Sequence, residues 1–411
     1  MEENLLLAKV AMMVGLLVAV SVVARATLAR VGVPSIIGYL ALGFGLRLID
    51  DRLGFMGVEH HQALRFLAEL GVIALLFRVG LEANLQGLVR QLGTAWPIWI
   101  GNVIVSGGFG FAVARWGLGA GLMPSLVVAT ALTATSVAIP SAVWKGAGKL
   151  KSREGQLFLD VAVLDDISGI ALMALLFGFL PALEHPGEES LLLVLGAVGL
   201  KTAVQFALFG GACFLFAVFV EPRVTSFCKR LRDAPDPMLI VFSIGIIIAG
   251  FGEVLGTSVA IGAFFAGLAF SRDAKTTRVE ASFEPVYELL TPFFFIVLSY
   301  GMSPASLASA GIPAIALLAA AVVGKVFGAG GPALLRLPAS SALVLGVSMV
   351  PRAEIGLLIV ERGHRLGAWA VPDQIYAAVV AVGAATCLIA PVVLTRLLKN
   401  STDRGEHVTT H

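Results

Sequence analysis

Two adjacent carboxylates, Asp165 and Asp166, lie in an apolar segment that is long enough to cross a lipid bilayer. The segment, residues 158–177, reads FLDVAVLDDISGIALMALLF and contains no basic residue. A carboxylate near the centre of a bilayer costs roughly 2.5–3.5 kcal/mol on insertion scales, so two in one span need a compensating reason. The pair therefore favours a membrane protein with a polar site in its interior.

The composition of the whole chain supports a membrane setting. Hydrophobic residues make up 58% of the 411 residues and charged residues only 14%, and the mean hydropathy is +0.92. So few charges could not cover the surface of a soluble protein of this size. The net charge of +2 gives no basis for nucleic-acid binding. The three cysteines lack disulfide or metal-ligand spacing, and Cys213 and Cys387, which lie in apolar segments, are interpreted as packing residues.

Polar and Gly/Pro-rich breaks divide the chain into about thirteen predicted membrane helices. These cover residues 5–29, 33–50, 62–83, 87–116, 121–145, 154–181, 190–220, 236–253, 256–271, 283–303, 308–335, 339–363 and 370–398. The sequence thus predicts an all-α, polytopic protein with one transmembrane domain over residues 1–400. A short polar tail, residues 401–411, is predicted to be disordered and cytoplasmic.

The distribution of Lys and Arg predicts the orientation. Loops that follow odd-numbered spans, together with the C-terminal tail, carry eighteen of these residues, whereas even-numbered loops and their edges carry five. Positively charged loops stay in the cytoplasm, so the C-terminus is predicted to be cytoplasmic and the N-terminus to lie outside. A prokaryotic inner membrane is the simplest setting for such a chain.

Two predicted spans are interrupted. The fifth, LVVATALTATSVAIPSAVW, concentrates hydroxyl groups, including Thr135 and Ser136. We predict a break or a kink at Ile139 because Pro140 disfavours helical geometry there. The twelfth, VLGVSMVPRAEIGLLIV, is interrupted at Pro351. Hydroxyls at a break could coordinate a small cation. Alternatively, the fifth span is a kinked packing helix whose hydroxyls bond to its own backbone.

The positions of these breaks predict an internal repeat. Each interrupted span is followed by one further span in its half, so residues 5–181 and 236–398 form two inverted six-helix repeats if 190–220 is a linker helix. Two broken helices would then cross, with Thr135 and Arg352 at the crossing. Arg352 and Glu354 could neutralise the partial charges of the helix ends there, or could simply pair with each other and close the bundle.

Lys325 lies among apolar and small residues and needs a carboxylate partner. Desolvation favours loss of its proton and a nearby carboxylate opposes it, so the lysine could release a proton as a cation arrives, or form a static salt bridge with Asp165. Asp165 and Asp166 lie about 100° apart around a helix, so one is expected to face Lys325 and the other a cation cavity. For Asp160, in the same span, we favour a supporting structural role.

A buried acid pair with these breaks indicates an ion-coupled carrier, and the motifs resemble the cation:proton antiporter superfamily. The similarity is to its NapA-like and Kef-like sodium (or potassium)/proton branch and spans nearly the whole chain. It rests on VPSIIGYLALGFGL at 33–46, AELGVIALLFRVGLE at 68–82, TATSVAI at 133–139, EGQLFLDVAVLDDISGI at 154–170, AIGAFFAGLAFS at 260–271 and SMVPRAEIGLL at 348–358.

The resemblance implies a NhaA/NapA-like antiporter fold and a role for each matching residue. Asp166 would bind Na⁺ (or Li⁺ or K⁺) and the competing proton, and Asp165 would pair with Lys325. Thr135 would contribute to the cation site, with Ser136 beside it. Glu354 and Arg352 would stabilise the crossing. It further implies a homodimer with an elevator-like core and no cofactor.

Three departures from that pattern and several alternatives remain. Asp160 and Arg78 stand where apolar or small residues are usual, and Ala353 replaces a frequent glycine. An organic-anion/sodium symporter on the same fold, and a K⁺/H⁺ antiporter without a regulatory domain, are the alternative functions. An intramembrane aspartyl protease is disfavoured because the two acids are sequential rather than on separate helices. We therefore expect a transporter and not an enzyme.

Overall fold

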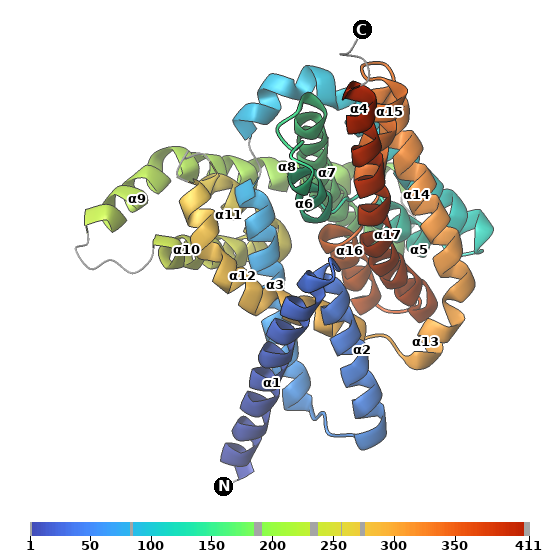
Figure 1. The fold of residues 1–411 in the computed structure, drawn as a ribbon. Helices are drawn as coiled ribbons and strands as arrows, with labels where there is room; N and C mark the ends of the chain where they lie inside the picture. The colour runs from blue at the N-terminus through green and yellow to red at the C-terminus, as the bar shows by residue number, and fades with distance from the viewer. Residues whose placement is uncertain are drawn as a thin grey trace. The chain divides into compact units, whose positions relative to one another are not determined.

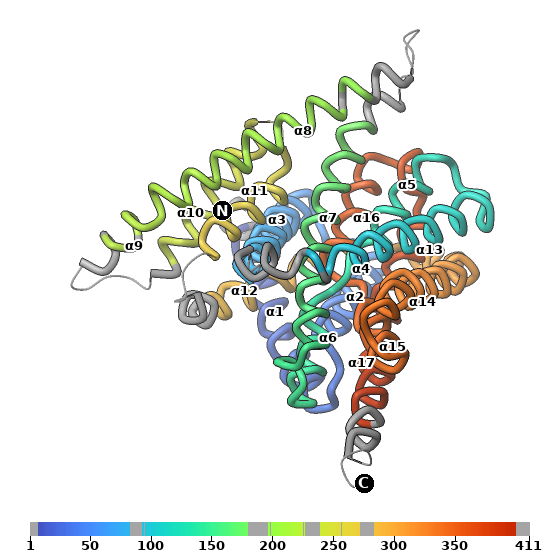
Figure 2. Tube along the Cα trace, turned by 90° about the horizontal axis from the view of Figure 1, so that it is seen from above, coloured from blue at the N-terminus to red at the C-terminus, as the bar shows by residue number. Residues whose placement is uncertain are grey.

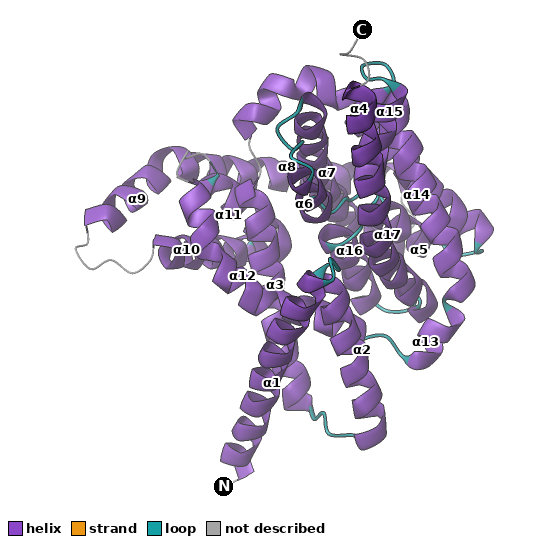
Figure 3. Cartoon of the chain, viewed as in Figure 1, coloured by secondary structure: helices purple, strands orange, loops and turns teal. Residues whose placement is uncertain are grey.

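The structure, a computed structural model, describes residues 2–82, 85–184, 191–230, 237–255, 257–271 and 276–406. Throughout these residues the regular structure is helical, and none of them forms a strand (Figure 3). A helix satisfies its backbone hydrogen bonds within one segment, which is what the interior of a bilayer demands of an apolar chain. The predicted all-helical class is confirmed.

Each of the thirteen predicted segments corresponds to one helix or to a pair of helices (Figure 1). The uninterrupted ones are α1 (Glu2–Arg30), α2 (Ser35–Leu53), α3 (Val58–Glu82), α4 (Leu85–Ala112), α7 (Arg153–Glu184), α8 (Leu191–Leu215), α10 (Pro237–Val254), α11 (Val259–Phe270), α12 (Thr276–Tyr300), α14 (Gly311–Ala333) and α17 (Asp373–Glu406). The interrupted ones are α5 (Leu122–Ala131) with α6 (Ala138–Gly146), and α15 (Ala339–Ser348) with α16 (Glu354–Arg365).

Smaller elements complete the helices. Both α4 and α8 continue into a five-residue π-helical stretch, and two short helices lie at the edges of predicted spans: α9 (Glu221–Arg230) and α13 (Pro304–Ser309). The last helix, α17, extends beyond the predicted end of its span into the predicted tail, and residues 407–411 lie outside the described residues. Residues 190 and 236, where two predicted segments begin, also lie outside them.

Length and hydropathy make this a multi-pass membrane protein. Within the described residues, six helices are long and apolar enough to cross a membrane, and four shorter helices are also apolar. The shorter ones include α10 and α11, which correspond to the two spans 236–253 and 256–271 that the sequence predicts with a break between them. The structure supports that break, because Glu253 accepts a hydrogen bond from the Val259 amide and Ser258 caps the start of α11.

The chain forms two compact units that alternate along the sequence. The first contains residues 1–23, 50–85 and 174–297, and the second contains residues 24–49, 86–173 and 298–411. The predicted limits of the two inverted repeats stay a prediction.

Glycines hold the first unit together where α3 packs along α11. A Cβ atom on Gly80 or Gly267 would collide with backbone atoms of the opposite helix, so only glycine allows this approach. Phe77 packs edge-on against Phe242 and Phe283 beside this contact. Close backbone contact at small residues is the usual means of packing helices in a membrane.

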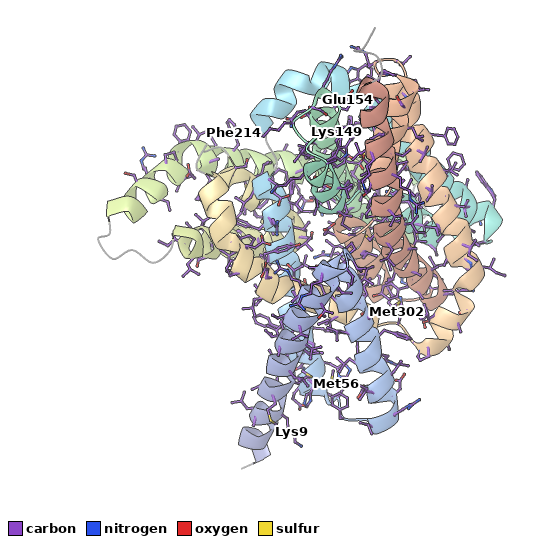
Figure 4. All side chains as sticks on the ribbon, in the orientation of Figure 1. Lys9, Met56, Lys149, Glu154, Phe214 and Met302 are labelled. Atoms are coloured by element: carbon purple, nitrogen blue, oxygen red, sulfur yellow. The ribbon has the colours of Figure 1, made fainter. Side chains whose placement is uncertain are left out.

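The second unit is built around α14, which packs on α15 and α17 (Figure 2). Gly346 on α15 lies so close to α14 that a Cβ atom would stand 2.8 Å from the Val326 carbonyl oxygen. The turn between α6 and α7 is tied to α17, because Lys149 donates to the carbonyl of Leu398 over 3.0 Å (Figure 4 labels Lys149). These contacts place both interrupted helices in one compact unit.

Candidate functional site

The two interrupted helices meet at their breaks. Between α5 and α6 the chain leaves helical geometry over residues 132–137, and between α15 and α16 over residues 349–353. The Ser136 amide donates to the Pro351 carbonyl over 2.8 Å, and the Thr135 hydroxyl reaches the Met349 carbonyl at 3.2 Å. Each break thus satisfies backbone groups that the other leaves open, which explains why both persist in an apolar interior. The predicted crossing near Thr135 and Arg352 is present.

The position of the first break corrects one prediction. Ile139 is helical, and Pro140 lies in the first turn of α6 instead of ending the helix before it. Amides in the first turn of a helix have no partner within the helix, so a proline there loses no hydrogen bond. The break falls earlier, at the residues that bond to the second broken helix. Pro351, in contrast, lies inside its break as predicted.

A buried ion pair lies beside the crossing. Lys325 Nζ stands 2.6 Å from Asp165 Oδ2, and both side chains are fully buried. The ammonium also donates to the Thr133 carbonyl over 2.5 Å, which links α14 to the first break. The predicted partnership of Asp165 with Lys325 is therefore present in the geometry. An isolated charge buried this deeply would be strongly unfavourable, so each side chain depends on the other.

Asp165 accepts two further hydrogen bonds. The Thr135 hydroxyl donates to Oδ2 over 2.5 Å, and the Asn102 amide nitrogen donates to Oδ1 over 2.8 Å. With Lys325, three donors from three elements therefore converge on one carboxylate. Both of its oxygens therefore act as hydrogen-bond acceptors in this site.

Asp166, the next residue along α7, is also buried, with an exposed fraction of 6%. Its charge acts on Lys325, as does that of Arg352. Asp165, Asp166, Lys325 and Arg352 thus gather at the crossing, and Glu354 lies beside it at the start of α16. Thr135 was predicted to contribute to the cation site, and in this structure its hydroxyl donates a hydrogen bond to Asp165.

The other predicted residues lie at or near the crossing. Arg352 is buried and donates through Nη1 to the Ala134 carbonyl, across the two breaks. Ser136 is fully buried, and its hydroxyl has no hydrogen-bond partner among the described residues. Glu354 is the first residue of α16, where a carboxylate complements the positive end of the helix dipole.

Asp160 lies apart from the pair. On a regular helix it is roughly 140° from Asp165 and roughly 120° from Asp166, in opposite senses around the axis. Its Oδ2 atom is buried without a hydrogen-bond partner among the described residues. Asp160 therefore does not share a helix face with either member of the pair.

Arg78 belongs to the first unit and forms a separate cluster. It pairs with Glu82 at 2.7 Å, one turn further along α3. It also pairs with Glu284 of α12 at 2.9 Å and lies 4.3 Å from the ring centroid of Tyr287. This cluster links α3 to α12, and that contact could not be predicted from the local sequence.

Sequence reasoning missed Asn102. It lies in the segment WPIWIGNVIVSGG of α4, and its side chain is fully buried. An amide flanked by apolar residues in a predicted span was the available signal, because such a group needs a partner inside the protein. Which partner it takes depends on how α4 packs against α7 and α14.

Two interrupted helices that cross beside buried carboxylates of a third helix define an ion-coupled membrane transporter. The sequence profile of the family described as "Sodium/hydrogen exchanger, transmembrane" matches residues 16–400. The chain belongs to this family of transporters, which are not enzymes. The resemblance inferred from the motifs is thereby confirmed.

Individual relatives of this chain are also named as antiporters. The "High-affinity Na(+)/H(+) antiporter NhaS3" of Synechocystis is 28% identical over 338 residues, which cover 80% of this chain and 70% of that protein. The "Na(+)/H(+)-K(+) antiporter GerN" of Bacillus cereus is 30% identical, and the match covers 89% of this chain and 90% of that protein. The solved structure of the sodium proton antiporter MjNhaP1 from Methanocaldococcus jannaschii has the same fold, with a TM-score of 0.69, 13% identity, and coverage of 95% of this chain and 98% of that one.

Proposed function

We propose that this member of the family exchanges Na⁺ for protons, and that the two ions compete for Asp166. The observation that carries this proposal is the difference between the two adjacent carboxylates. Asp165 is tied to Lys325, Thr135 and Asn102, and we assign the exchanged ion to Asp166, which is buried beside it at the crossing. The oxygens of Thr135, Ser136 and the unwound backbone would supply further ligands of the kind that Na⁺ prefers.

The charges of the site support exchange rather than simple uptake. An entering Na⁺ adds one positive charge to a buried site. Displacement of a proton held by Asp166, or loss of a proton from Lys325, removes that added charge. Such a balance couples cation entry to proton release through the cost of buried charge.

Several finer features belong to the same proposal. We expect alternating access by an elevator-like movement of the unit that holds the site, assembly as a homodimer, and a prokaryotic inner membrane as the location, with the N-terminus outside and the C-terminus in the cytoplasm. K⁺/H⁺ exchange is the second candidate, because the name of the GerN relative includes K⁺. No observation favours an organic anion at a site that presents carboxylates.

The test measures proton flux in sealed proteoliposomes with a pre-set pH gradient, with Na⁺, Li⁺ or K⁺ added in turn and the membrane potential clamped. In the wild type we expect Na⁺ to collapse the gradient. Asp166→Asn should reduce this flux to the level of protein-free vesicles. Asp160→Asn is the matched control, since it makes the same chemical change on another face of α7, and it should retain exchange. Na⁺-driven flux in purified Asp166→Asn protein would refute the assignment of the site.

A further inference from the structure

We infer that α17 carries a backbone clamp for the transport site, in which Thr386 and Cys387 hold the main chain of Arg352 at the second break. This inference rests on the proposed exchange of a cation for a proton where the two breaks cross. The Arg352 amide donates to the Thr386 hydroxyl oxygen over 3.1 Å. The Cys387 thiol donates to the Arg352 carbonyl over 3.3 Å. Both main-chain polar groups of one residue are thus bound by adjacent side chains of another helix.

The clamp completes the set of contacts that keeps the second break open. Arg352 lies between the end of α15 and the start of α16, where the chain is not helical. Other carbonyls of this break bond to the first break: the Thr135 hydroxyl reaches that of Met349, and the Ser136 amide donates to that of Pro351. Unpaired main-chain groups are costly in an apolar interior. The first break therefore supports residues 349 and 351, whereas α17 supports residue 352.

The Thr386 hydroxyl is oriented to accept the Arg352 amide. It is buried, and it donates its own proton to the Gly383 carbonyl, one turn earlier on α17, over 3.0 Å. A hydroxyl has one proton to donate, so its lone pairs remain to accept. A bond from a helical threonine to its own backbone is common. Acceptance of an amide from a separate element is the additional feature that makes Thr386 part of a clamp.

Gly383 brings α17 close enough for both bonds to form. A Cβ atom on Gly383 would lie 3.2 Å from the Arg352 carbonyl oxygen and 3.0 Å from a side-chain carbon of Leu357. Both distances are shorter than an ordinary van der Waals contact, so a larger residue would press the second break away from α17. Gly383 precedes the two clamp residues by three and four positions, which places all three on one face of the helix.

The clamp acts on the ion site through the Arg352 side chain. While α17 holds the main chain of Arg352, the guanidinium donates through Nη1 to the Ala134 carbonyl of the first break. Ala134 directly precedes Thr135 and Ser136, the hydroxyl residues that we assign to the Na⁺ site. A shift of Arg352 would therefore release the backbone that presents these oxygens. The two clamp residues are positioning residues of the site.

Loss of the clamp should weaken the apparent affinity for Na⁺. Thr386→Val keeps the shape of the side chain but removes the acceptor of the Arg352 amide. We expect the Na⁺ concentration at half-maximal flux to rise about fivefold to tenfold, the usual consequence of a buried polar group left unpaired. The maximal flux should stay within about twofold of the wild type. A threonine that only supports the fold would lower the maximal flux and leave the half-saturating concentration unchanged.

The flux experiment titrates Na⁺ at one pH in the proteoliposome assay. It compares the wild type, Thr386→Val, Thr386→Ser and Thr395→Val. Thr386→Ser retains the hydroxyl and should restore the half-saturating concentration to within about twofold of the wild type. Thr395→Val is the control, because it makes the same change on α17 at an exposed hydroxyl that bonds to the Pro391 carbonyl of its own helix. It should also keep the wild-type value.

Hydrogen–deuterium exchange tests the clamp without any transport. The Arg352 amide is protected by its bond to Thr386, so Thr386→Val should speed the exchange of a peptide that covers residues 349–354. We expect an increase of about fivefold or more in the rate of its slowest amide. The same peptide should exchange at the wild-type rate in Thr386→Ser and in Thr395→Val.

Either of two results would overturn the inference: an unchanged half-saturating Na⁺ concentration in folded Thr386→Val, or a wild-type exchange rate of the peptide in that variant. If Thr386→Val does not fold, Gly383→Ala carries the test, because its Cβ atom presses on the Arg352 carbonyl. It should raise the half-saturating concentration, and an unchanged value would reject the clamp. If the wild type shows no cation-driven flux, the proposed function fails, and the exchange rates still decide whether α17 holds the second break.

Discussion

Asp165 and Asp166 are chemically identical and adjacent, yet their surroundings give them different tasks. Asp165 accepts hydrogen bonds from α4, α14 and the first break, and so behaves as part of the scaffold. Asp166 lies about 100° further around α7 and therefore faces a different direction. A residue's role here is decided by which helices surround it, because the intrinsic chemistry of the two side chains is the same.

Removal of one partner of the Asp165–Lys325 ion pair should destabilise the second unit, because the other partner then stays buried without its countercharge. Asp165→Asn leaves the buried ammonium without its countercharge and should lower the free energy of unfolding by about 3–5 kcal/mol. The double variant Asp165→Asn with Lys325→Met removes both charges and should recover most of this loss. Thermal unfolding in detergent measures the loss of stability in the single variant and its recovery in the double variant. If the double variant is no more stable than Asp165→Asn, the pair is not the source of the effect.

At the scale of elements, glycines decide which helices can meet. In the first unit, α3 and α11 approach until backbone atoms touch at Gly80 and Gly267. In the second, Gly346 and Gly328 allow α15 and α4 to lie against α14. The helices themselves form because the segments are apolar, but their close contacts depend on positions without a side chain.

Gly267→Ala should therefore destabilise the first unit. The added Cβ atom would collide with the backbone of Phe77, so α3 and α11 must separate, at a cost of about 1–3 kcal/mol. Gly15→Ala is the control, since a Cβ atom at Gly15 in α1 would meet no atom within 4 Å. That variant should be as stable as the wild type or slightly more stable, because alanine favours a helix. A lower unfolding temperature for Gly15→Ala than for Gly267→Ala would contradict this account.

At the scale of the whole molecule, the chain is a multi-pass membrane protein whose orientation is set by its loops. Eighteen Lys and Arg residues in the odd-numbered loops and the C-terminal tail, against five in the even-numbered ones, predict which loops remain in the cytoplasm. This asymmetry is a property of the sequence and does not depend on how the helices pack. It can therefore be tested without any functional assay.

Cysteine labelling of intact cells tests the orientation. Lys151→Cys, in the exposed turn between α6 and α7, should react with an impermeant maleimide only after the cytoplasmic side is opened. Glu59→Cys, an exposed position in the first turn of α3, should react from outside. Both are made in a chain whose three native cysteines are replaced by alanine. The reverse pattern would mean that the orientation is inverted.

Much of the fold could be read from the sequence. Hydropathy located each membrane helix to within a few residues at most boundaries, since burial in lipid acts on the local composition of a segment. The positions of Asp165, Asp166 and Lys325 stood out for the same reason, because a charged group in an apolar segment is conspicuous without any knowledge of packing. Pro351 likewise marked the second break through a local effect on the backbone.

Only the tertiary structure decided which of these groups touch. It moved the first break away from Pro140 to residues 132–137, where the backbone bonds to the second broken helix. It also showed that the Thr135 hydroxyl donates to Asp165. Asn102, 63 residues before Asp165 in the chain, donates to the same carboxylate. Hydrogen bonds between helices depend on which faces meet, and those faces are selected by glycine contacts between segments that are distant in the chain. No local property of the sequence contains that information.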